Sequence, residues 1–354
     1  MADDSTTILK QIGGFKIILP ILVGVGVAGY MLYSEFSTKE FPKLDIGYKA
    51  VFWFVLAWLM MVLRDFGYVL RVRLLTENEL SWRQSFQIIM VWEFTSAITP
   101  SMVGGTSVAV LFFNREGISI GKSSAIVMAT SFLDQLYFSL LFPIFVLIVG
   151  PSKLFDIGGT AAAGADFLSL SNLFVYFAVV GYSLMLAYTL IVFYGLFINP
   201  RGLKILLWWI FKLPLIRKWR RKAAATGNDL VIASKHLKSK GFVFWLKTFG
   251  ATIFAWSGRY LIVNFLLLAF GSHPDQFLVY TRQFVMWIMM IVSPTPGGSG
   301  FAEYVFKEYL SEFIPLGFTG ILAFLWRLIS YYPYLFIGAI VLPRWLRRGA
   351  VKTV

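Results

Sequence analysis

Two segments rich in proline and glycine interrupt apolar stretches of this chain: VSPTPGGSG at residues 292–300 and ITPSMVGG at residues 98–105. The first divides the apolar stretch 277–314, and the second divides 84–113. Proline removes a backbone donor and paired glycines permit a sharp reversal, so neither stretch is expected to form one continuous helix. We predict two re-entrant hairpins of paired half-helices, with turns at Pro100, Gly104, Gly105, Pro294, Pro296, Gly297 and Gly298.

The composition places these hairpins in a membrane protein. Of 354 residues, 58% are hydrophobic and 14% are charged, and the mean hydropathy is +0.73. Soluble domains are about 45–50% apolar, so too little polar surface remains here to cover a water-soluble core. The absence of cysteine excludes disulfides, iron–sulfur clusters and cysteine nucleophiles, and there are two histidines, His236 and His273. We therefore expect no metal, no cofactor and no catalytic residues.

Apolar helices of about 20 residues are long enough to cross a bilayer. Six candidates meet this length, and we predict an all-α polytopic protein forming one integral membrane domain over residues 1–354. The candidates are 15–36 (a retained anchor helix), 46–70, 122–149, 171–198, 242–270 and 316–342.

The net charge of +14 fits this topology. Most of the 32 Lys and Arg residues fall in segments that are cytoplasmic if both termini are inside, as the positive-inside rule requires. Residues 199–241 mix cations with aromatic and aliphatic side chains, which is typical of an amphipathic segment on an anionic leaflet. We expect the protein in the cytoplasmic (inner) membrane, with anionic membrane lipids and not nucleic acid as partners.

Spacing within the chain indicates an inverted repeat. Gly104-Gly105 and Gly297-Gly298 are 193 residues apart, and an odd number of predicted crossings separates the two halves. The first half with its connecting helix covers 46–198, and the second covers 242–342. Many secondary transporters have this organisation, with sites near the midplane between broken helices. The competing interpretation is coincidence among apolar sequence.

The run PTPGGSGFAE at 294–303 resembles the motif of the lysylphosphatidylglycerol synthase transmembrane region, a flippase-like family. Pro100 with Gly104-Gly105, and Asp134 within SFLD, fit the family's first-half pattern, whereas Thr106–Ala109 depart from its acidic and basic continuation. The resemblance covers roughly residues 15–345. It does not extend to the soluble aminoacyl-transferase domain that the full synthases carry. It implies movement of a lipid and not its synthesis.

Ionisable side chains inside spans are the candidate substrate-binding residues. An unpaired charge at the bilayer centre costs about 2.5–3.5 kcal/mol, so such residues must be paired, hydrated or functional. We predict that Arg259, Arg327 and Arg64 hold a lipid phosphate in a central polar cavity, since the planar guanidinium suits phosphate. Asp134 and Glu303 would orient these arginines or accept a proton or a cationic headgroup, with Arg64-Asp65 and Glu93 as further members of the site. The structural alternative is a buried ion pair between Asp134 and Arg327 that locks the halves together.

The sequence therefore favours flipping of a polar or anionic lipid, such as a phospholipid or lipid-linked intermediate, by alternating access. The alternatives are transport of a small anionic or proton-coupled solute and a non-transporting accessory role in envelope or lipid biosynthesis. A membrane enzyme acting on a lipid headgroup is disfavoured, because no nucleophile, base or metal cluster is evident.

Overall fold

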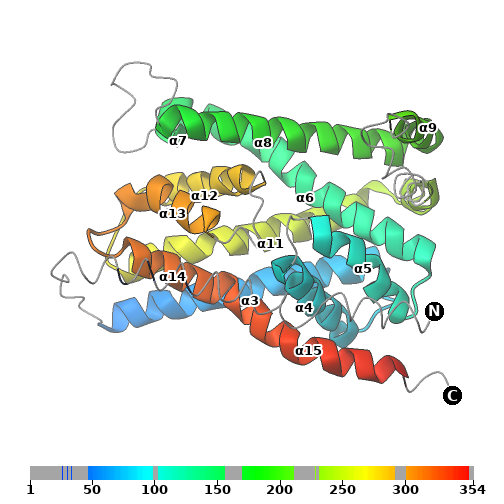
Figure 1. Cartoon of the computed structure of the whole chain (residues 1–354), viewed down its shortest axis with the longest axis horizontal. Helices are drawn as coiled ribbons and strands as arrows, with labels where there is room; N and C mark the ends of the chain where they lie inside the picture. Colours follow the sequence, from blue (N-terminus) through cyan, green and yellow to red (C-terminus); the bar gives the residue numbers. More distant parts are fainter. Residues whose placement is uncertain are drawn as a thin grey trace.

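The computed structural model describes residues 47–98, 103–155, 170–210, 231–291 and 300–350, together with 26, 30, 33 and 228, and every regular element in this part of the chain is a helix. The longer helices lie roughly along one common direction (Figure 1). In chain order the elements are α3 (Tyr48–Leu75), α4 (Trp82–Ile98), α5 (Val103–Arg115), α6 (Ile120–Val149), α7 (Pro151–Phe155), α8 (Leu170–Phe193), a π-helical turn (Tyr194–Ile198), α9 (Pro200–Ile210), α11 (Phe242–Ala269), α12 (Gln276–Met290), α13 (Phe301–Leu310), a 3₁₀ turn (Ser311–Phe313), α14 (Thr319–Ser330) and α15 (Tyr332–Ala350).

Five stretches among the described residues are long and apolar enough to cross a membrane: Tyr48–Leu75, Ile120–Val149, Leu173–Ile198, Phe242–Ala269 and Thr319–Leu342. They coincide with five of the six predicted spans, which confirms an all-α, multi-pass membrane protein. The predicted anchor helix 15–36 lies outside the described residues, apart from helical positions 26, 30 and 33.

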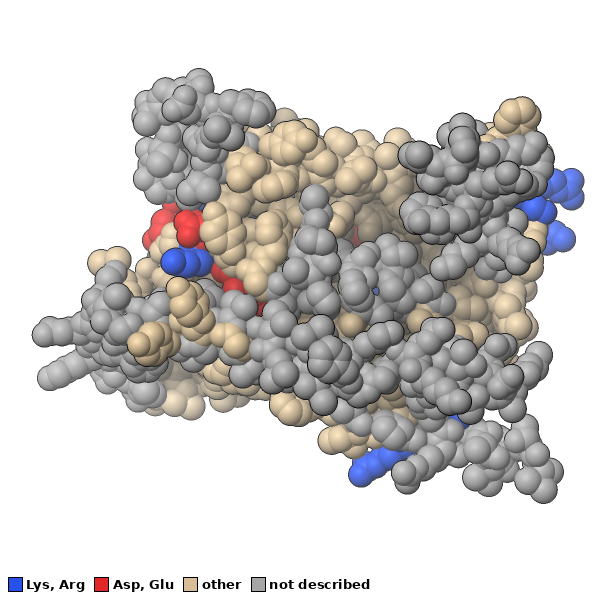
Figure 2. Space-filling model, viewed as in Figure 1, with Lys and Arg blue, Asp and Glu red and all other residues tan. Residues whose placement is uncertain are grey.

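The surface of the bundle suits a lipid environment. Large apolar side chains such as Val62, Leu147 and Leu190 are exposed along the spans. In Figure 2 the charged residues of the visible face gather mostly towards the two ends of the molecule, and tan residues fill much of the middle. Exposed leucine and valine in such numbers would be costly in water, whereas acyl chains accept them without penalty.

Helices α3 and α11 form the central pair, and they are antiparallel: Trp53 near the start of α3 stacks on Phe265 near the end of α11. Two glycines permit their close approach. A Cβ at Gly67 would lie 2.9 Å from the Cβ of Ala255, and one at Gly258 would lie 3.0 Å from the carbonyl oxygen of Met60. The backbones therefore pack directly against one another, as small residues allow in membrane helices.

Each stretch interrupted by proline and glycine contains two separate helices, α4 with α5 and α12 with α13, and the two members of each pair contact one another. Because α5 begins at Val103, Gly104 and Gly105 lie in its first helical turn and not in the preceding reversal, which corrects their predicted place. Glycine is tolerated at a helix start, where backbone donors lack helical partners in any case. The other predicted turn residues, Pro100, Pro294, Pro296, Gly297 and Gly298, lie outside the described residues.

The sixth predicted span, 316–342, is not one helix. Helix α14 ends at Ser330, Tyr331 leaves helical geometry with φ −131° and ψ −54°, and α15 starts at Tyr332. Pro333 is the second residue of α15, where its missing N–H costs no helical hydrogen bond, whereas in a continuous helix it would leave the carbonyl group of Ile329 without a donor. The predicted span is therefore present as Thr319–Leu342, but it is interrupted at Tyr331 and is not one continuous helix.

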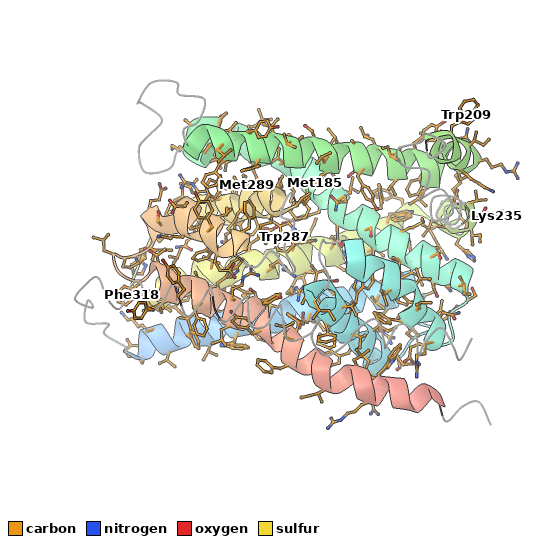
Figure 3. All side chains as sticks on the ribbon, viewed as in Figure 1. Met185, Trp209, Lys235, Trp287, Met289 and Phe318 are labelled. Atoms are coloured by element: carbon orange, nitrogen blue, oxygen red, sulfur yellow. The ribbon has the colours of Figure 1, made fainter. Side chains whose placement is uncertain are left out.

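The two ends of the bundle carry different elements. Helix α7 and the loop before α14 lie at one end, and α9 lies at the other, where it is seen nearly end-on beside α8 (Figure 1). Trp209 and Lys235 lie at the α9 end (Figure 3), and Arg201, Lys204 and Trp209 on α9 are exposed. Residues 211–227 of the predicted basic segment lie outside the described residues.

Candidate functional site

The middle of α3, α4 and α11 brings three of the predicted site residues together. Arg64 Nη2 donates to Glu93 Oε1 at 2.6 Å. Glu93 Oε2 lies 3.8 Å from Nη2 of Arg259. Glu93 thus faces two arginines from two different helices, one closely and one at the limit of an ion pair. The sequence analysis predicted that Arg64, Glu93 and Arg259 belong to one site, but it did not predict the short ion pair between Arg64 and Glu93.

Both terminal nitrogens of Arg64 are bound by the protein itself, whereas its Nε has no acceptor among the described residues. Its Nη1 also donates to Asp65 Oδ1 at 3.0 Å, and its guanidinium lies over the rings of Tyr68 and Tyr334 at 4.6 and 5.0 Å. The hydroxyl of Tyr334 donates to the same Asp65 oxygen at 2.6 Å. Because the Arg64 side chain is fully buried between two carboxylates, its role in this structure is to fix α3, α4 and α15 together.

Asp134 pairs with Arg71, an arginine that the sequence analysis did not single out as a site residue. Arg71 Nη1 and Nη2 donate to the two carboxylate oxygens at 2.5 and 3.2 Å. Trp256 Nε1 on α11 donates to Asp134 as well, at 2.9 Å. The alternative pairing of Asp134 with Arg327 was therefore wrong. The available signal was spacing, because Arg71 follows Arg64 by seven residues and so shares its helix face.

Glu303 and Arg327 are paired with each other. Arg327 Nε donates to Glu303 Oε1 at 2.7 Å, and both side chains are buried. The other Glu303 oxygen accepts the backbone N–H of Gly300 at 2.7 Å, where α13 begins after a residue with φ +85°. This carboxylate caps the helix start and neutralises Arg327 at once. Glu303 therefore orients one of the predicted arginines, Arg327, but this ion pair is separate from the cluster of Arg64, Glu93 and Arg259.

Arg259 is held differently from the other arginines. Its guanidinium lies over the rings of Trp287 and Trp256, at 4.7 and 5.2 Å from their centroids, and Figure 3 shows Trp287 in the interior of the bundle. Among the described residues, its buried Nε has no hydrogen-bond acceptor, as is also true of Nε in Arg64 and Arg71, and Nε1 of Trp287 has none either. Its charge is balanced only by the long contact to Glu93 and by the two aromatic faces.

The central charges balance overall. Three arginines (Arg64, Arg71 and Arg259) face three carboxylates (Asp65, Glu93 and Asp134). Exposure is uneven, since the Arg64 side chain is 0% exposed, whereas Glu93 retains 26% and Arg259 retains 14%. Glu93 and Arg259 thus keep part of their surface exposed, as do Asp65 at 19% and Asp134 at 22%, whereas Arg64 and Arg71 are buried.

The described residues contain no group of three or more His, Cys, Asp or Glu side chains that could hold a metal ion. The chemistry offered by the central cluster is that of ion pairing, cation–π contact and N–H donation. These groups can hold a negatively charged or strongly polar headgroup.

Comparison with known proteins gives a consistent picture. The profile of the family described as lysylphosphatidylglycerol synthase TM region matches residues 17–338. A UPF0104 membrane protein of Archaeoglobus fulgidus is 30% identical over 337 residues, which cover 91% of this chain and 95% of that protein. The matched region includes α3 to α14 and all the residues of the central cluster.

Proposed function

Because the chain belongs to the lysylphosphatidylglycerol synthase transmembrane-region family, we propose that it translocates a polar or anionic lipid, or a lipid-linked intermediate, by alternating access at the central cluster. The family is one of integral membrane proteins of lipid metabolism or envelope biosynthesis. Translocation is a finer claim, and it is supported chiefly by the state of one side chain, Arg259.

Arg259 is the arginine best suited to a lipid phosphate. Arg64 and Arg71 each have a carboxylate within 2.6 Å, whereas the nearest carboxylate oxygen to Arg259 is 3.8 Å away. A charge inside a membrane helix is costly, and incomplete pairing is retained where a ligand completes it. Among the predicted phosphate ligands, Arg64 and Arg327 serve as fixed ion pairs in this proposal, and Arg259 is the substrate contact.

An inverted repeat would supply the two alternating states, and the helix boundaries support it. Helices α3 and α11 both have 28 residues, and they start 194 positions apart at Tyr48 and Phe242. Helices α4 and α12 also start 194 positions apart. Arg64 packs against Gly258, its own counterpart at this offset. A contact that maps onto itself is expected at a two-fold axis between inverted halves.

We also propose that the helix pairs α4–α5 and α12–α13 each enter and leave the membrane on the same side, and that both termini are cytoplasmic. The α9 end carries Arg201, Lys204 and Lys235, which supports placing it at the cytoplasmic face of an anionic leaflet. In this proposal the protein moves a lipid without chemically modifying it.

A liposome assay with fluorescent phosphatidylglycerol, in which an impermeant quencher reports exchange between leaflets, tests translocation. We expect Arg259→Ala to lower the rate about tenfold or more, and Arg259→Lys to retain part of it, since lysine keeps the charge but loses the planar fork. Arg83→Ala removes an exposed cation as the matched control. An unchanged rate in folded Arg259→Ala protein would overturn the proposal, and uptake of a soluble anion without lipid exchange would favour the solute alternative.

A further inference from the structure

Glu93 and Trp287 occupy the same place in their helices. Glu93 is the twelfth residue of α4, counted from Trp82, and Trp287 is the twelfth residue of α12, counted from Gln276. Asp65 and Arg259 correspond in the same way in α3 and α11. In the first half Glu93 gives a carboxylate to Arg64, whereas in the second half Trp287 gives an indole ring to Arg259. Arg259 therefore has no acid from its own half and shares the acid of Arg64.

Glu93 is already biased towards Arg64. The distance from its carboxylate to Arg64 is 2.6 Å and that to Arg259 is 3.8 Å, and its side chain is 26% exposed. A small rotation of an accessible carboxylate would complete its contact with Arg64 and release Arg259. Arg64 cannot follow, because it is fully buried and also bound to Asp65.

The contact between Arg259 and Trp287 contains two N–H donors without an acceptor in the described part of the chain, one from each side chain. Nε of Arg259 and Nε1 of Trp287 are both buried without an acceptor among the described residues, and the guanidinium lies 4.7 Å from the Trp287 ring centre. Buried donors are nearly always satisfied in proteins, by protein groups, water or ligand. An anionic headgroup with two or more oxygens, such as a phosphodiester, can accept from both groups.

Resting on the proposed function, we propose that Glu93 is an exchangeable counter-ion: an incoming phosphodiester headgroup displaces it from Arg259 and takes a second hydrogen bond from Trp287 Nε1. Trp287 is then a further binding residue, and the carboxylate of Glu93 competes with the phosphodiester for Arg259. Because the central charges balance, an added anion meets the full repulsion of Glu93 until that carboxylate withdraws. Weak binding of this kind allows the headgroup to be released again.

Binding is measured on the full chain in detergent, by titrating dioctanoyl phosphatidylglycerol and following the unfolding temperature. We expect Glu93→Gln to lower the Kd roughly tenfold, since it removes the competing charge but keeps the side-chain shape. We expect Trp287→Phe to raise the Kd about fivefold or more, since it removes the N–H donor but retains the aromatic face under Arg259. Trp245→Phe, which alters an indole packed against Phe132 and Phe197, is the matched control and should leave the Kd unchanged.

Two further ligands separate the sources of the phosphate. Dioctanoyl phosphatidylcholine carries the same phosphodiester with a compensating cation, and we expect Glu93→Gln to change its Kd far less. Glycerol 3-phosphate carries no acyl chains. Equal tightening of this soluble anion and the lipid supports counter-ion exchange, whereas tightening of the soluble anion alone overturns the lipid headgroup as the ligand.

The outcome is separable from that of the translocation assay. An unchanged or higher Kd for the lipid in Glu93→Gln overturns the exchange, even if the wild-type protein moves lipid. If Glu93→Gln fails to fold, an unchanged Kd in Trp287→Phe overturns the role of its donor. Tighter binding to Glu93→Gln combined with no lipid movement by wild type would support the exchange and overturn the proposed function.

Discussion

Arg282 and Arg259 both belong to the second half, yet Arg282 is buried whereas Arg259 keeps part of its side chain exposed, and their surroundings are opposite. Arg282 on α12 donates to the carbonyl oxygens of Lys153 and Tyr309 and pairs with Glu312 at 3.0 Å. Arg259 has one contact to a carboxylate, at 3.8 Å. A guanidinium whose donors are all directed at fixed protein groups stabilises the fold. Arg259 lacks a close carboxylate among the described residues, and this difference, not its unpaired Nε, which Arg64 and Arg71 share, distinguishes it from the other arginines.

Arg282 also binds α12 to α7 and to the end of α13, so it closes the α7 end of the bundle. Its guanidinium lies over the rings of Tyr309 and Phe313, and the hydroxyl of Tyr309 donates to the carbonyl oxygen of Leu154. At the α9 end the comparable contacts are partly exposed, as between Lys240 and Glu77 at 2.7 Å. Among the described residues, the contacts at the α7 end are therefore more buried than those at the α9 end.

The largest expected effect is that of Arg282→Met. Removing this buried guanidinium leaves two carbonyl groups and the partly exposed Glu312 without their donor, and we expect a loss of about 2–4 kcal/mol in the free energy of unfolding. Equilibrium unfolding in mixed detergent micelles measures it. Arg259→Met is the matched variant, and we expect a change within about 1 kcal/mol, since Glu93 keeps Arg64. Equal losses in the two variants would contradict the distinction between these arginines.

Overpacking at the α3–α11 crossing should come next. We expect Gly258→Val to destabilise the protein by about 1–3 kcal/mol, because the added carbons would meet the backbone of Met60. The crossing also positions Arg259, so lipid translocation should fall with stability. Gly250→Val is the control, since a Cβ there meets nothing within 4 Å. A neutral Gly258→Val would show that the helices separate easily.

Removal of one hydroxyl group at the α7 end should lower the free energy of unfolding by a smaller amount. Tyr309→Phe leaves the carbonyl group of Leu154 without its donor but keeps the aromatic ring near Arg282. We expect a loss of about 1–2 kcal/mol in the free energy of unfolding, again by equilibrium unfolding. Tyr304→Phe, which changes an exposed tyrosine on the same helix, should have no measurable effect, and a similar loss in both variants would argue against the Tyr309 hydrogen bond.

The smallest effect is expected at the opposite end. The hydrogen bond from Lys240 lowers the pKa of Glu77 below its ordinary value of 4.5. A lowered pKa means that the pair contributes stability above the ordinary value and loses it as the pH falls through the folded-state pKa. The pair is solvent-exposed, so we expect Glu77→Gln to lower the free energy of unfolding by less than about 1 kcal/mol at pH 7.

The unfolding temperatures of wild type and Glu77→Gln should therefore converge as the pH is lowered from 7 to 3. They should also converge in 1 M salt at pH 7, because salt screens exposed pairs. A gap that widens at low pH would contradict the assigned direction of the Glu77 pKa.

The sequence predicted the spans and their interruptions well, because both depend on local properties. An apolar run long enough to cross a bilayer is recognisable without its neighbours, and so is a proline–glycine break between α4 and α5. The break at Tyr331 was missed although Pro333 was visible, because the apolar run continues through it. Gly104 and Gly105 were placed in a turn, since glycine favours turns and helix starts alike.

The site was predicted only as a set of residue types. Arg64, Glu93 and Arg259 do meet, but Asp134 joins Arg71 and Glu303 takes Arg327. Trp287 was not distinguished from other aromatic residues, because its unpaired N–H exists only once the helices are packed.

By itself the sequence determined that the chain is a helical membrane protein, where five of its spans lie and that several charges lie within them. These follow from the transfer of side chains between water and lipid, which is nearly additive along the chain. Tertiary structure alone decided which carboxylate neutralises which arginine, because ion pairing depends on distances of a few ångströms between helices distant in sequence. It thereby left Arg259 incompletely paired, and this one outcome of packing carries the functional proposal.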